Sequence, residues 1–486
     1  MNYLLGVDFG TLSCRAVLLD ETGDLVATAA RDYPHGCIDG ENSAVYQEPR
    51  DYLDCISSVV RQVVKGREEN VVSLCIDFTA CTMLPVDAAL QPLDRARLWK
   101  SHSATDQARR VTEACRELGV DLSCYGGTVS PEWLIPKILE IREDSPEIYE
   151  KTAWFLEAAD WLTWLLTGQK IRSACFAGFK GLWQGGWPTE LIRRLGLEER
   201  FFEGQVRHAG ACVGQLNAYG CRLLGLTEKT RVTVPLIDAH SALPAAGVYR
   251  DGDMMLILGT SGCELMLSKQ SVNIPGFCGR VYDGLLPGYY CYEAGTPCLG
   301  DMFGWFTRHL LQDEKGFARM DGLAEKLTDN PVWAIDWWNG SRTPYLDADL
   351  SGCLFGLSLR TGPEHIYRAL LEAAAFGTRR VLELARSHGA PVTRLVAGGG
   401  IPQKNPLFMQ ILADVLEKTI YINENEPASA VGAAILSAWG GGLYPSAEAA
   451  IEALAKKQTR CFVPSGAHYG EKYRRYVKMS DALAAK

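Results

Sequence analysis

The sequence predicts an α/β fold organised as two domains. The chain has 486 residues, which is long for one domain and sufficient for two, each with a sizeable core. Its N-terminal part reads as short strands, then a helix, then another strand, with polar residues where strands end. A hairpin of two apolar strands around a glycine turn recurs about 250 residues later, a separation expected between two domains.

The N-terminal part begins with three strands joined by tight turns. We predict these strands at residues Tyr3–Val7, Arg15–Asp20 and Leu25–Ala30. The stretch "EPRDYLDCISSVVRQVV" follows, with apolar residues at helical spacing behind Pro49, a favourable first-turn residue. The next apolar strand, Val71–Ile76, ends at Asp77 and Thr79. Ligands of α/β sheets bind at such strand ends.

Asp8 in "VDFGT" places a charge at the end of an apolar strand. A carboxylate there costs several kcal/mol unless it is paired, hydrogen-bonded or faces a metal ion. Gly10 and Thr11 follow, and such a turn offers backbone N–H groups and a hydroxyl to an anion. The combination suggests a polyphosphate with its magnesium ion. The alternative is a carboxylate that only stabilises a turn.

The second half repeats this layout. "DGDMMLILGTSGCELMLS" reads as a strand, a turn at Gly259, Thr260 and Ser261, and a second strand. "PEHIYRALLEAAAFGTRRVLELARSHG" reads as a long helix that Gly389 ends. It leads to the strand "TRLVA", the turn "GGGIPQKN" and the helix "PLFMQILADVL", which Asn405 is expected to cap. This order suits a nucleotide, although many glycine-rich turns bind no ligand.

We place the domain boundary near residues 245–252, which gives domains of residues 1–247 and 248–486. Just before it, "VPLIDAHSALPAAG" puts Asp238 between an apolar strand and a helix-like run. Asp238 is either a helix N-cap or a catalytic carboxylate, and this stretch alone does not separate the two.

Composition excludes some classes of partner. Hydrophobic residues make up 47%, charged residues 22%, and the net charge is -9. This acidity argues against a nucleic-acid partner, which needs a clustered basic face. No apolar run suits a signal sequence or a membrane span, so we expect a cytoplasmic protein without a membrane partner.

The 16 cysteines form no CxxC pair and no Cys/His zinc spacing, which favours reduced thiols. His208 and Cys212 in "HAGAC" face one way if this stretch is helical. Two ligands do not make a metal site.

Taken together, the motifs resemble the FGGY family of carbohydrate kinases, members of the actin-like ATPase superfamily, over nearly the whole chain. The actin-like part rests on "DFGTLSCR" and "LGTSGC" as two phosphate hairpins and on "AGGG" as an adenosine turn. The family part rests on "SGCLFGLSLRTGPEHIYRALLE" and, more loosely, on "SPEWLIPKILEI". The resemblance implies an α/β protein with two actin-like (ribonuclease H-like) domains that flank a catalytic cleft. The first domain would carry the sugar side, the first phosphate hairpin and the catalytic aspartate, and the second the other hairpin and the adenosine site.

Further motifs resemble the ribulokinase branch of that family. They are "IDFTACTMLPVD", "LWKSH", "GGTVSPEW", "AGFKG", "DAHSALPAAG", "CYEAG", "GDMFGWF", "DWWNGSR" and "KNPLFMQILADVL". The chain departs from that branch at Phe179 and Glu264, where histidines are usual, and at Thr296 and Pro297. The implied activity is ATP-dependent phosphorylation of a ketopentose, with L-ribulose to L-ribulose 5-phosphate first. D-ribulose, xylulose or a related ketose are the alternatives.

The resemblance also implies the cofactors ATP and Mg²⁺ and a role for each site residue. Asp8 would hold the magnesium ion through water, because this ion keeps several of its waters. The residues expected around ATP are Asp8, Gly10, Thr11, Gly259, Thr260 and Ser261 at the phosphates and Gly399, Gly400 and Asn405 at the adenosine. The residues expected around the ketopentose are Ala80, Trp99, Lys180, Asp238 and Glu293.

Asp238 would accept the proton of the attacking sugar hydroxyl. We expect an ordinary aspartate pKa of about 3.9 there. Such a weak base suffices if proton removal is late in a loose transition state.

Two other function classes are considered. A non-catalytic actin-like protein, either a sugar sensor or an assembly-forming ATPase, would keep Asp8 and the hairpins without needing Asp238, Lys180 and Glu293 together. A dehydrogenase would need GxGxxG after the first strand, which is absent. For the tryptophans of "DWWNGSR" we favour packing over ligand stacking. The residues do not fix the oligomeric state, and a homodimer is one open possibility.

Overall fold

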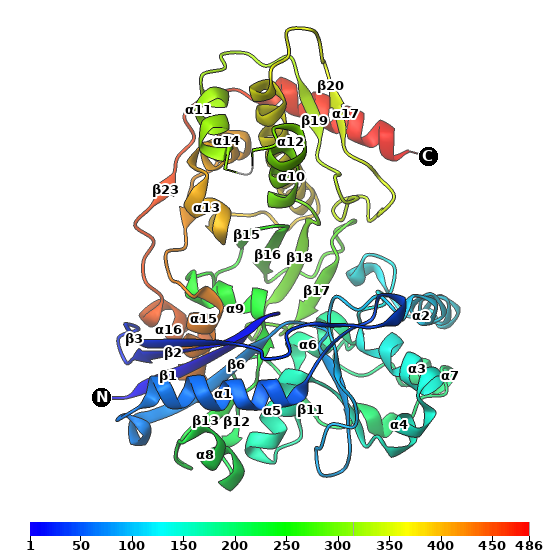
Figure 1. Ribbon diagram of the computed structural model, residues 1–486, viewed down its shortest axis with the longest axis vertical. Coiled ribbons are helices and arrows are strands. Elements are labelled where there is room, and N and C mark those ends of the chain that lie inside the picture. The colour runs from blue at the N-terminus through cyan, green and yellow to red at the C-terminus, as the bar shows by residue number, and fades with distance from the viewer. Residues whose placement is uncertain (314, 486) are drawn as a thin grey trace. The chain divides into compact units, whose positions relative to one another are not determined.

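The computed structural model describes residues 1–313 and 315–485, and it divides into two compact units, each described here by itself. Unit 1 comprises Met1–Tyr249, Arg280–Cys291 and Asn425–Lys457. Unit 2 comprises Arg250–Gly279, Tyr292–Glu424 and Gln458–Lys486. Both units combine strands with helices (Figure 1), so the predicted α/β class is confirmed.

Strands are found throughout the chain. They are β1 (Tyr3–Phe9), β2 (Ser13–Asp20), β3 (Leu25–Asp32), β4 (Ile38–Asp39), β5 (Val45–Gln47), β6 (Val71–Phe78), β7 (Met83–Val86), β8 (Ala96–Arg97), β9 (Trp154–Glu157), β10 (Ile171–Ser173), β11 (Gln205–Arg207), β12 (Cys212–Gln215), β13 (Arg231–Thr233), β14 (Leu236–Ile237), β15 (Asp253–Leu258), β16 (Gly262–Ser268), β17 (Gly279–Tyr282), β18 (Tyr290–Thr296), β19 (Trp333–Ile335), β20 (Cys353–Phe355), β21 (Arg394–Gly398), β22 (Ile420–Ile422) and β23 (Cys461–Phe462).

Helices alternate with these strands. They are α1 (Pro49–Val64), α2 (Thr105–Leu118), α3 (Leu134–Asp144), α4 (Pro146–Lys151), α5 (Ala158–Thr167), α6 (Ala174–Lys180), α7 (Thr189–Arg194), α8 (Ala218–Leu224), α9 (Asp238–Ala245), α10 (Gly300–Trp305), α11 (Phe317–Glu325), α12 (Pro363–Ser387), α13 (Gly400–Lys404), α14 (Pro406–Leu416), α15 (Ala428–Gly440), α16 (Ala447–Leu454) and α17 (Gly470–Ala484).

The main sheet of unit 1 contains the predicted N-terminal strands. Its order is β12-β13-β6-β1-β2-β3, and β14 adds to β6. β1 runs antiparallel to β2 and parallel to β6. α1 lies along one face of the sheet, and α15 lies on the other (Figure 1). The three predicted strands, the predicted helix and the following strand are therefore confirmed, and β1 extends past Asp8 to Phe9.

Small residues let α15 pack closely on this sheet. A Cβ at Gly6 of β1 would lie 1.9 Å from the Ala430 carbonyl oxygen. A Cβ at Gly432 of α15 would lie 1.7 Å from the carbonyl oxygen of Ser241 in α9. The Ser241 hydroxyl also donates to the Ser429 carbonyl at 2.7 Å. The segment 425–457, placed in the second domain by the sequence, thus belongs to unit 1 because α15 completes its core.

The segment 280–291 also belongs to unit 1, although the predicted boundary assigned it to the second domain. A Cβ at Gly178 of α6 would lie 2.3 Å from Cγ1 of Val281, so this segment packs closely on α6. Both units are therefore assembled from separate stretches of sequence rather than from contiguous halves.

A second sheet in unit 1, ordered β4-β5-β8-β7-β9, supports the loops after β6 and β8. An apolar core forms beside it and includes Met83 of β7, Ile138 of α3 and Phe155 of β9. Burial of such side chains contributes about 25 cal/mol per Å² of apolar surface. This core holds α3 against the backbone of the two loops.

The main sheet of unit 2 includes the strand order β18-β16-β15-β21-β22-β23. β15 and β16 form the predicted hairpin, and α12 is the predicted long helix. Asn405 caps α14 as predicted, since its side-chain oxygen accepts from the Phe408 N–H at 2.8 Å. The predicted turn "GGGIPQKN" is different: most of it forms the short helix α13 after Gly399.

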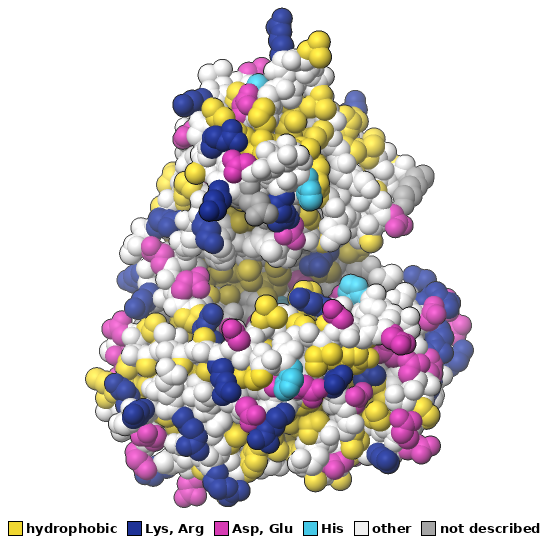
Figure 2. Space-filling view, in the orientation of Figure 1, with side chains coloured by type: hydrophobic (Ala, Val, Ile, Leu, Met, Phe, Trp, Pro, Cys, Tyr) yellow, Lys and Arg dark blue, Asp and Glu magenta, His cyan; other side chains and the backbone are white. Residues whose placement is uncertain are grey.

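Several other expectations can be compared with the structure. All 16 cysteines are free thiols, as predicted. His208 and Cys212 do not share a helix, because β11 ends just before His208 and Cys212 begins β12. No helix within the described ranges has the length and apolar character of a membrane span. On the face drawn in Figure 2, acidic and basic side chains are interspersed.

Gly432→Ala should destabilise the protein, because its Cβ would overlap the Ser241 carbonyl oxygen. Overpacking of this kind costs about 1–3 kcal/mol. The matched control is Gly322→Ala in α11, where a Cβ meets nothing within 4 Å. That control should be neutral or gain up to about 1 kcal/mol from helix propensity. Urea unfolding measures both, and equal stabilities for the two variants would contradict the close packing of α15.

Candidate functional site

Three carboxylates lie at the ends of neighbouring strands in unit 1. Asp8 of β1 is the register partner of Asp77 of β6. β14 pairs with the same end of β6 and is followed at once by Asp238, the first residue of α9. The N-cap of α9 is Ile237, so the N-cap interpretation of Asp238 is wrong, although its Oδ1 accepts from the Ala239 N–H at 2.7 Å.

Burial raises the pKa values of all three carboxyl groups, and for Asp77 and Asp238 the charge of Asp8 adds to it. For Asp8, the neighbouring Asp77 side chain and the Arg15 charge lower the pKa but do not outweigh burial. Burial and the charge of Asp8 raise the pKa of Asp77, which is 0% exposed, well above its usual value. Asp238 keeps some exposed surface, but desolvation, helped by the Asp8 charge, raises its pKa to about 7. The expected ordinary pKa of Asp238 is therefore wrong.

The turn after β1 is held in place by side chains from elsewhere in unit 1. Tyr33 donates to the Gly10 carbonyl at 3.1 Å, and Gln47 Nε2 donates to the Thr11 carbonyl at 2.6 Å. Trp99 Nε1 donates to Thr11 Oγ1 at 3.2 Å, while the Trp99 side chain stays 40% exposed. The structure thus brings the predicted phosphate turn together with Trp99, one of the residues predicted to bind the sugar.

Lys180 ends α6 and is partly exposed beside two acidic side chains that the sequence reasoning missed. Although burial opposes it, a hydrogen bond from His102 and the charge of Lys180 lower the pKa of Glu132. Burial raises the pKa of Glu157 to about 7, against the charges of nearby lysines that include Lys180. The motif "SPEW" contains Glu132, but nothing in its spacing marked the residue as close to Lys180.

Phe179, one of the departures from the ribulokinase branch, does not extend the polar set around Lys180. Its ring is buried and packs on the His240 ring with centroids 4.5 Å apart. His240 lies two residues after Asp238 in α9, so Phe179 supports the backbone that carries Asp238.

In unit 2, the hairpin turn at Gly259, Thr260 and Ser261 is tied to the start of α10. The Leu299 N–H donates to the Thr260 carbonyl at 2.8 Å, and the Gly300 N–H donates to the Gly259 carbonyl at 3.0 Å. Gly259, Thr260 and Gly300 line a cavity of about 430 Å³, and residues of α13 line another side of it.

The predicted adenosine residues meet at this cavity. Gly400 and Asn405 line it together with apolar side chains such as Phe303 and Ile401. Gly399 adopts φ +94°, and a Cβ there would lie 2.6 Å from the Leu258 carbonyl oxygen, so only glycine fits. The amide of Asn405 is used internally, because its Nδ2 donates to Asp321 Oδ1 at 3.2 Å. An apolar cavity with a few polar groups suits an adenine base.

Glu293 lies in β18 of unit 2 and is only 8% exposed. The other departure, Glu264 of β16, is buried, and burial raises its pKa to about 7. Its Oε1 accepts from Thr378 at 3.4 Å. The predicted site residues are divided between the units, with Asp8, Gly10, Thr11, Ala80, Trp99, Lys180 and Asp238 in unit 1 and Gly259, Thr260, Ser261, Glu293, Gly399, Gly400 and Asn405 in unit 2.

Comparison with known proteins decides which family this arrangement represents. Residues 3–244 match the N-terminal domain of the FGGY family of carbohydrate kinases, and residues 254–441 match its C-terminal domain. The chain belongs to the FGGY family of carbohydrate kinases. It is accordingly an ATP-dependent sugar kinase with the actin-like ATPase fold, as the motifs predicted.

Relatives resemble the chain over almost its whole length. It is 37% identical to a protein named Ribulokinase from Geobacillus thermodenitrificans, over 99% of this chain and 94% of that protein. A Ribulokinase from Shouchella clausii is 38% identical, over 99% of this chain and 95% of the relative.

Solved structures share the fold. A xylulose kinase from Rhodospirillum rubrum superposes with a TM-score of 0.89 at 23% identity, covering 100% of this chain and 98% of the other. A xylulose kinase from Brucella ovis gives a TM-score of 0.89 at 21% identity, with 100% of both chains covered.

Asp77→Asn should stabilise the ligand-free protein more at pH 8 than at pH 5. The folded state holds the Asp77 proton to a pH well above the unfolded pKa of about 3.9, so stability falls as pH rises between the two values. Asparagine removes this loss. Thermal melting at both pH values measures the effect.

Asp20→Asn is the matched control for this prediction. Slight burial raises the pKa of Asp20, but hydrogen bonds from Thr22 and its neighbours outweigh it and lower the pKa. Stability from Asp20 is therefore present above the unfolded pKa, and its replacement should not stabilise the protein at pH 8. Equal gains for Asp77→Asn at the two pH values would contradict the buried, protonated state of Asp77.

Proposed function

We propose that this kinase phosphorylates a ketopentose, with L-ribulose to L-ribulose 5-phosphate as the first candidate reaction. The observation that carries the proposal is the full-length similarity to bacterial proteins named Ribulokinase. D-ribulose, xylulose or a related ketose is the alternative substrate. We retain this alternative because solved xylulose kinases share the fold. Fold alone does not set the sugar.

Asp238 is the proposed general base. It stands at the start of α9, where α15 and Phe179 fix the surrounding backbone. A pKa of about 7 makes it a stronger base than an ordinary aspartate near neutral pH. It would accept the proton of the attacking sugar hydroxyl as the phosphoryl group is transferred. Phosphoryl transfer depends more on the positioning of the reactants than on covalent participation by the protein.

The residues proposed for ATP are found in both units. Thr11 offers a hydroxyl and Gly10 a turn for the phosphates in unit 1, and Thr260 and Ser261 offer hydroxyls in unit 2. The cavity lined by Gly400 and Asn405 would take the adenosine. The amide of Asn405 would shape this cavity rather than read the base, because its polar atoms are engaged within the protein.

A magnesium ion fits the carboxylates of unit 1. The described residues contain no group of three or more acidic, histidine or cysteine side chains arranged to ligate an ion together. Magnesium commonly takes one or two carboxylates and completes its shell with water and phosphate oxygens, which suits Asp8. When bound, the ion would neutralise phosphate charge, and its charge would also favour the ionised forms of Asp8 and Asp238.

The sugar would bind to unit 1 through Lys180, Trp99 and the backbone near Ala80. Glu293, the other residue proposed for the sugar, lies in unit 2. A ketopentose presents hydroxyls and a carbonyl, which call for a cationic donor and carboxylate acceptors. The free thiols are consistent with a reducing compartment, so we place the protein in the cytoplasm. ATP and the sugar are the proposed partners.

Sugar-dependent ADP release tests the proposal. The purified protein is assayed with ATP and magnesium against L-ribulose, D-ribulose, D- and L-xylulose and non-pentose ketoses. L-ribulose should give the highest kcat/KM. The matched control is Asp238→Asn, which keeps the acceptor for the Ala239 N–H and should lose roughly a hundredfold to ten-thousandfold in kcat with a melting temperature no lower than that of wild type. The proposal would be contradicted if the wild-type protein turned over none of the pentuloses. It would also be contradicted if Asp238→Asn kept more than a tenth of the wild-type kcat.

Lys180→Ala should weaken sugar binding much more than ATP binding. A lost charge-assisted hydrogen bond is worth about 1.5–3 kcal/mol, or roughly tenfold to more than a hundredfold in sugar affinity. Calorimetry measures each ligand separately. Lys170→Ala, which removes an exposed lysine paired with Glu203, is the control and should leave both affinities unchanged. A similar loss for sugar and ATP in Lys180→Ala would show that Lys180 is not a sugar residue.

A further inference from the structure

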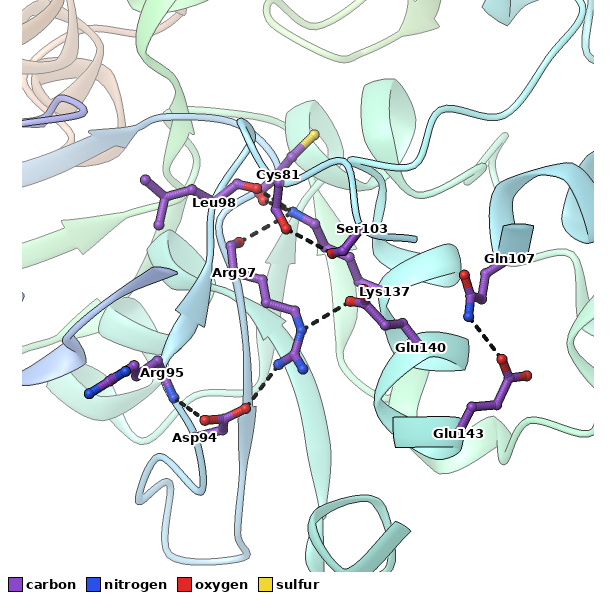
Figure 3. Close-up of polar contacts among 11 residues, drawn as sticks. Cys81, Asp94, Arg95, Arg97, Leu98, Ser103, Gln107, Lys137, Glu140 and Glu143 are labelled. Atoms are coloured by element: carbon purple, nitrogen blue, oxygen red, sulfur yellow. Dashed lines mark hydrogen bonds and ion pairs between the residues drawn. The ribbon is translucent and has the colours of Figure 1, made fainter. Parts of the chain in front are cut away.

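Lys137 of α3 is a buried lysine whose ammonium group is surrounded by backbone carbonyls. Its side chain is only 1% exposed. Nζ donates to the carbonyl oxygens of Cys81 at 2.5 Å, Leu98 at 2.8 Å and Arg97 at 3.2 Å (Figure 3). An ammonium group has three donors, so each has one acceptor here.

Two of these carbonyls, those of Cys81 and Leu98, belong to loops that contain predicted sugar residues, and the third belongs to Arg97 at the end of β8. Cys81 directly follows Ala80, and Leu98 directly precedes Trp99. Cys81 has φ +58°, a left-handed conformation that a non-glycine residue keeps only when its surroundings hold it there. The hydrogen bond from Lys137 to the Cys81 carbonyl is one such restraint. A single side chain therefore connects two stretches of backbone that are each adjacent to a predicted sugar residue.

The loop after β8 is held to α3 a second time. Arg97 is buried, and its Nε donates to Glu140 Oε2 at 3.1 Å, one turn after Lys137 on the same helix (Figure 3). Its Nη1 donates to Asp94 at 3.0 Å. α3 thus binds this loop through the side chain of Arg97 and through its backbone, while the loop after β6 depends on Lys137.

A buried charge that is not needed for packing points to a positional role. Burial lowers the pKa of Lys137, and the nearby carboxylates Glu157 and Glu132 act in the opposite direction. An apolar residue of similar length would fill the same space in the apolar core without desolvating a charge. What it could not do is donate to three carbonyls at fixed positions.

We propose that Lys137 is a positioning residue for sugar phosphorylation, which sets the spacing between the Ala80–Cys81 loop and the Leu98–Trp99 loop. It does not touch the sugar. Its hydrogen bonds fix the two stretches of backbone between which the ketopentose is bound, so the sugar hydroxyl reaches its attacking position reproducibly. This inference rests on the proposed function, because that proposal assigns Ala80 and Trp99 to the sugar.

The test is Lys137→Met, which keeps the length of the side chain and removes its three donors. We expect the KM for the sugar to rise tenfold or more, because the two loops adjacent to the predicted sugar residues lose the donors that hold them in place. The KM for ATP should stay within twofold of wild type. Hydrogen exchange should become faster in residues 79–83 and 97–101. Wild type must first show sugar-dependent ADP release, and its absence would overturn the proposed function rather than the role of Lys137.

Two control variants of α3 separate positioning from general stability. Ile138→Ala removes a buried side chain from the same core without removing a donor to the loops. It should lower the melting temperature while sugar KM stays within twofold. Glu143→Gln alters an acceptor of Gln107 on another face of the helix (Figure 3) and should change neither quantity.

Lys137→Gln provides a second variant, because it is uncharged and still donates two hydrogen bonds. It should fold even if Lys137→Met does not. Its sugar KM should lie between those of wild type and Lys137→Met. If Lys137→Met does not fold, the sugar KM of Lys137→Gln should still exceed that of wild type at least threefold. A wild-type sugar KM in either lysine variant, or an equal rise in sugar KM for Ile138→Ala at a matched loss of melting temperature, would overturn the role of Lys137.

Discussion

Asp8, Asp77 and Asp238 stand next to one another at the ends of β1, β6 and β14, and much of unit 1 follows from accommodating them. Desolvation and mutual repulsion make it unfavourable for all three to ionise together. Without a cation the group therefore holds its protons to a higher pH than ordinary aspartates do, and the charge of a bound cation would favour their release. The packing of α1 on one face of the sheet and of α15 on the other offsets the free-energy cost of keeping these groups together (Figure 1).

The polar side chains of unit 1 fall into two classes, one partly exposed and the other buried. Lys180 and Asp238 keep some exposed surface and are available to a ligand, whereas Lys137, Arg97 and Glu140 are buried and hold backbone in place. Unit 2 shows a different solution, because Gly399 permits a close backbone approach and the Asn405 amide is engaged within the protein. One unit thus concentrates charge, and the other provides an apolar cavity of about 430 Å³.

Local signals in the sequence were enough to predict the elements and the residue groups near strand ends. Apolar runs and turn residues located β1, β6, β15 and α12, and Asn405 was recognised as a cap. Properties that depend on distant contacts were missed. The raised pKa of Asp238 comes from burial in the folded protein, helped by the charge of Asp8 on another strand, and the place of α15 in unit 1 comes from contacts at Gly6 and Gly432. No spacing in the sequence encodes either.

The position of α15 has a consequence for the order in which the chain can fold. Residues 428–440 cover a face of the sheet that begins with residue 3, so most of the polypeptide must be synthesised before that face can be buried. Until then the nascent sheet exposes apolar surface, the condition under which large proteins aggregate or require chaperones. Contacts of such long sequence separation also close slowly. Unit 1 therefore begins to emerge from the ribosome before unit 2, yet it is completed only after most of unit 2 has been synthesised.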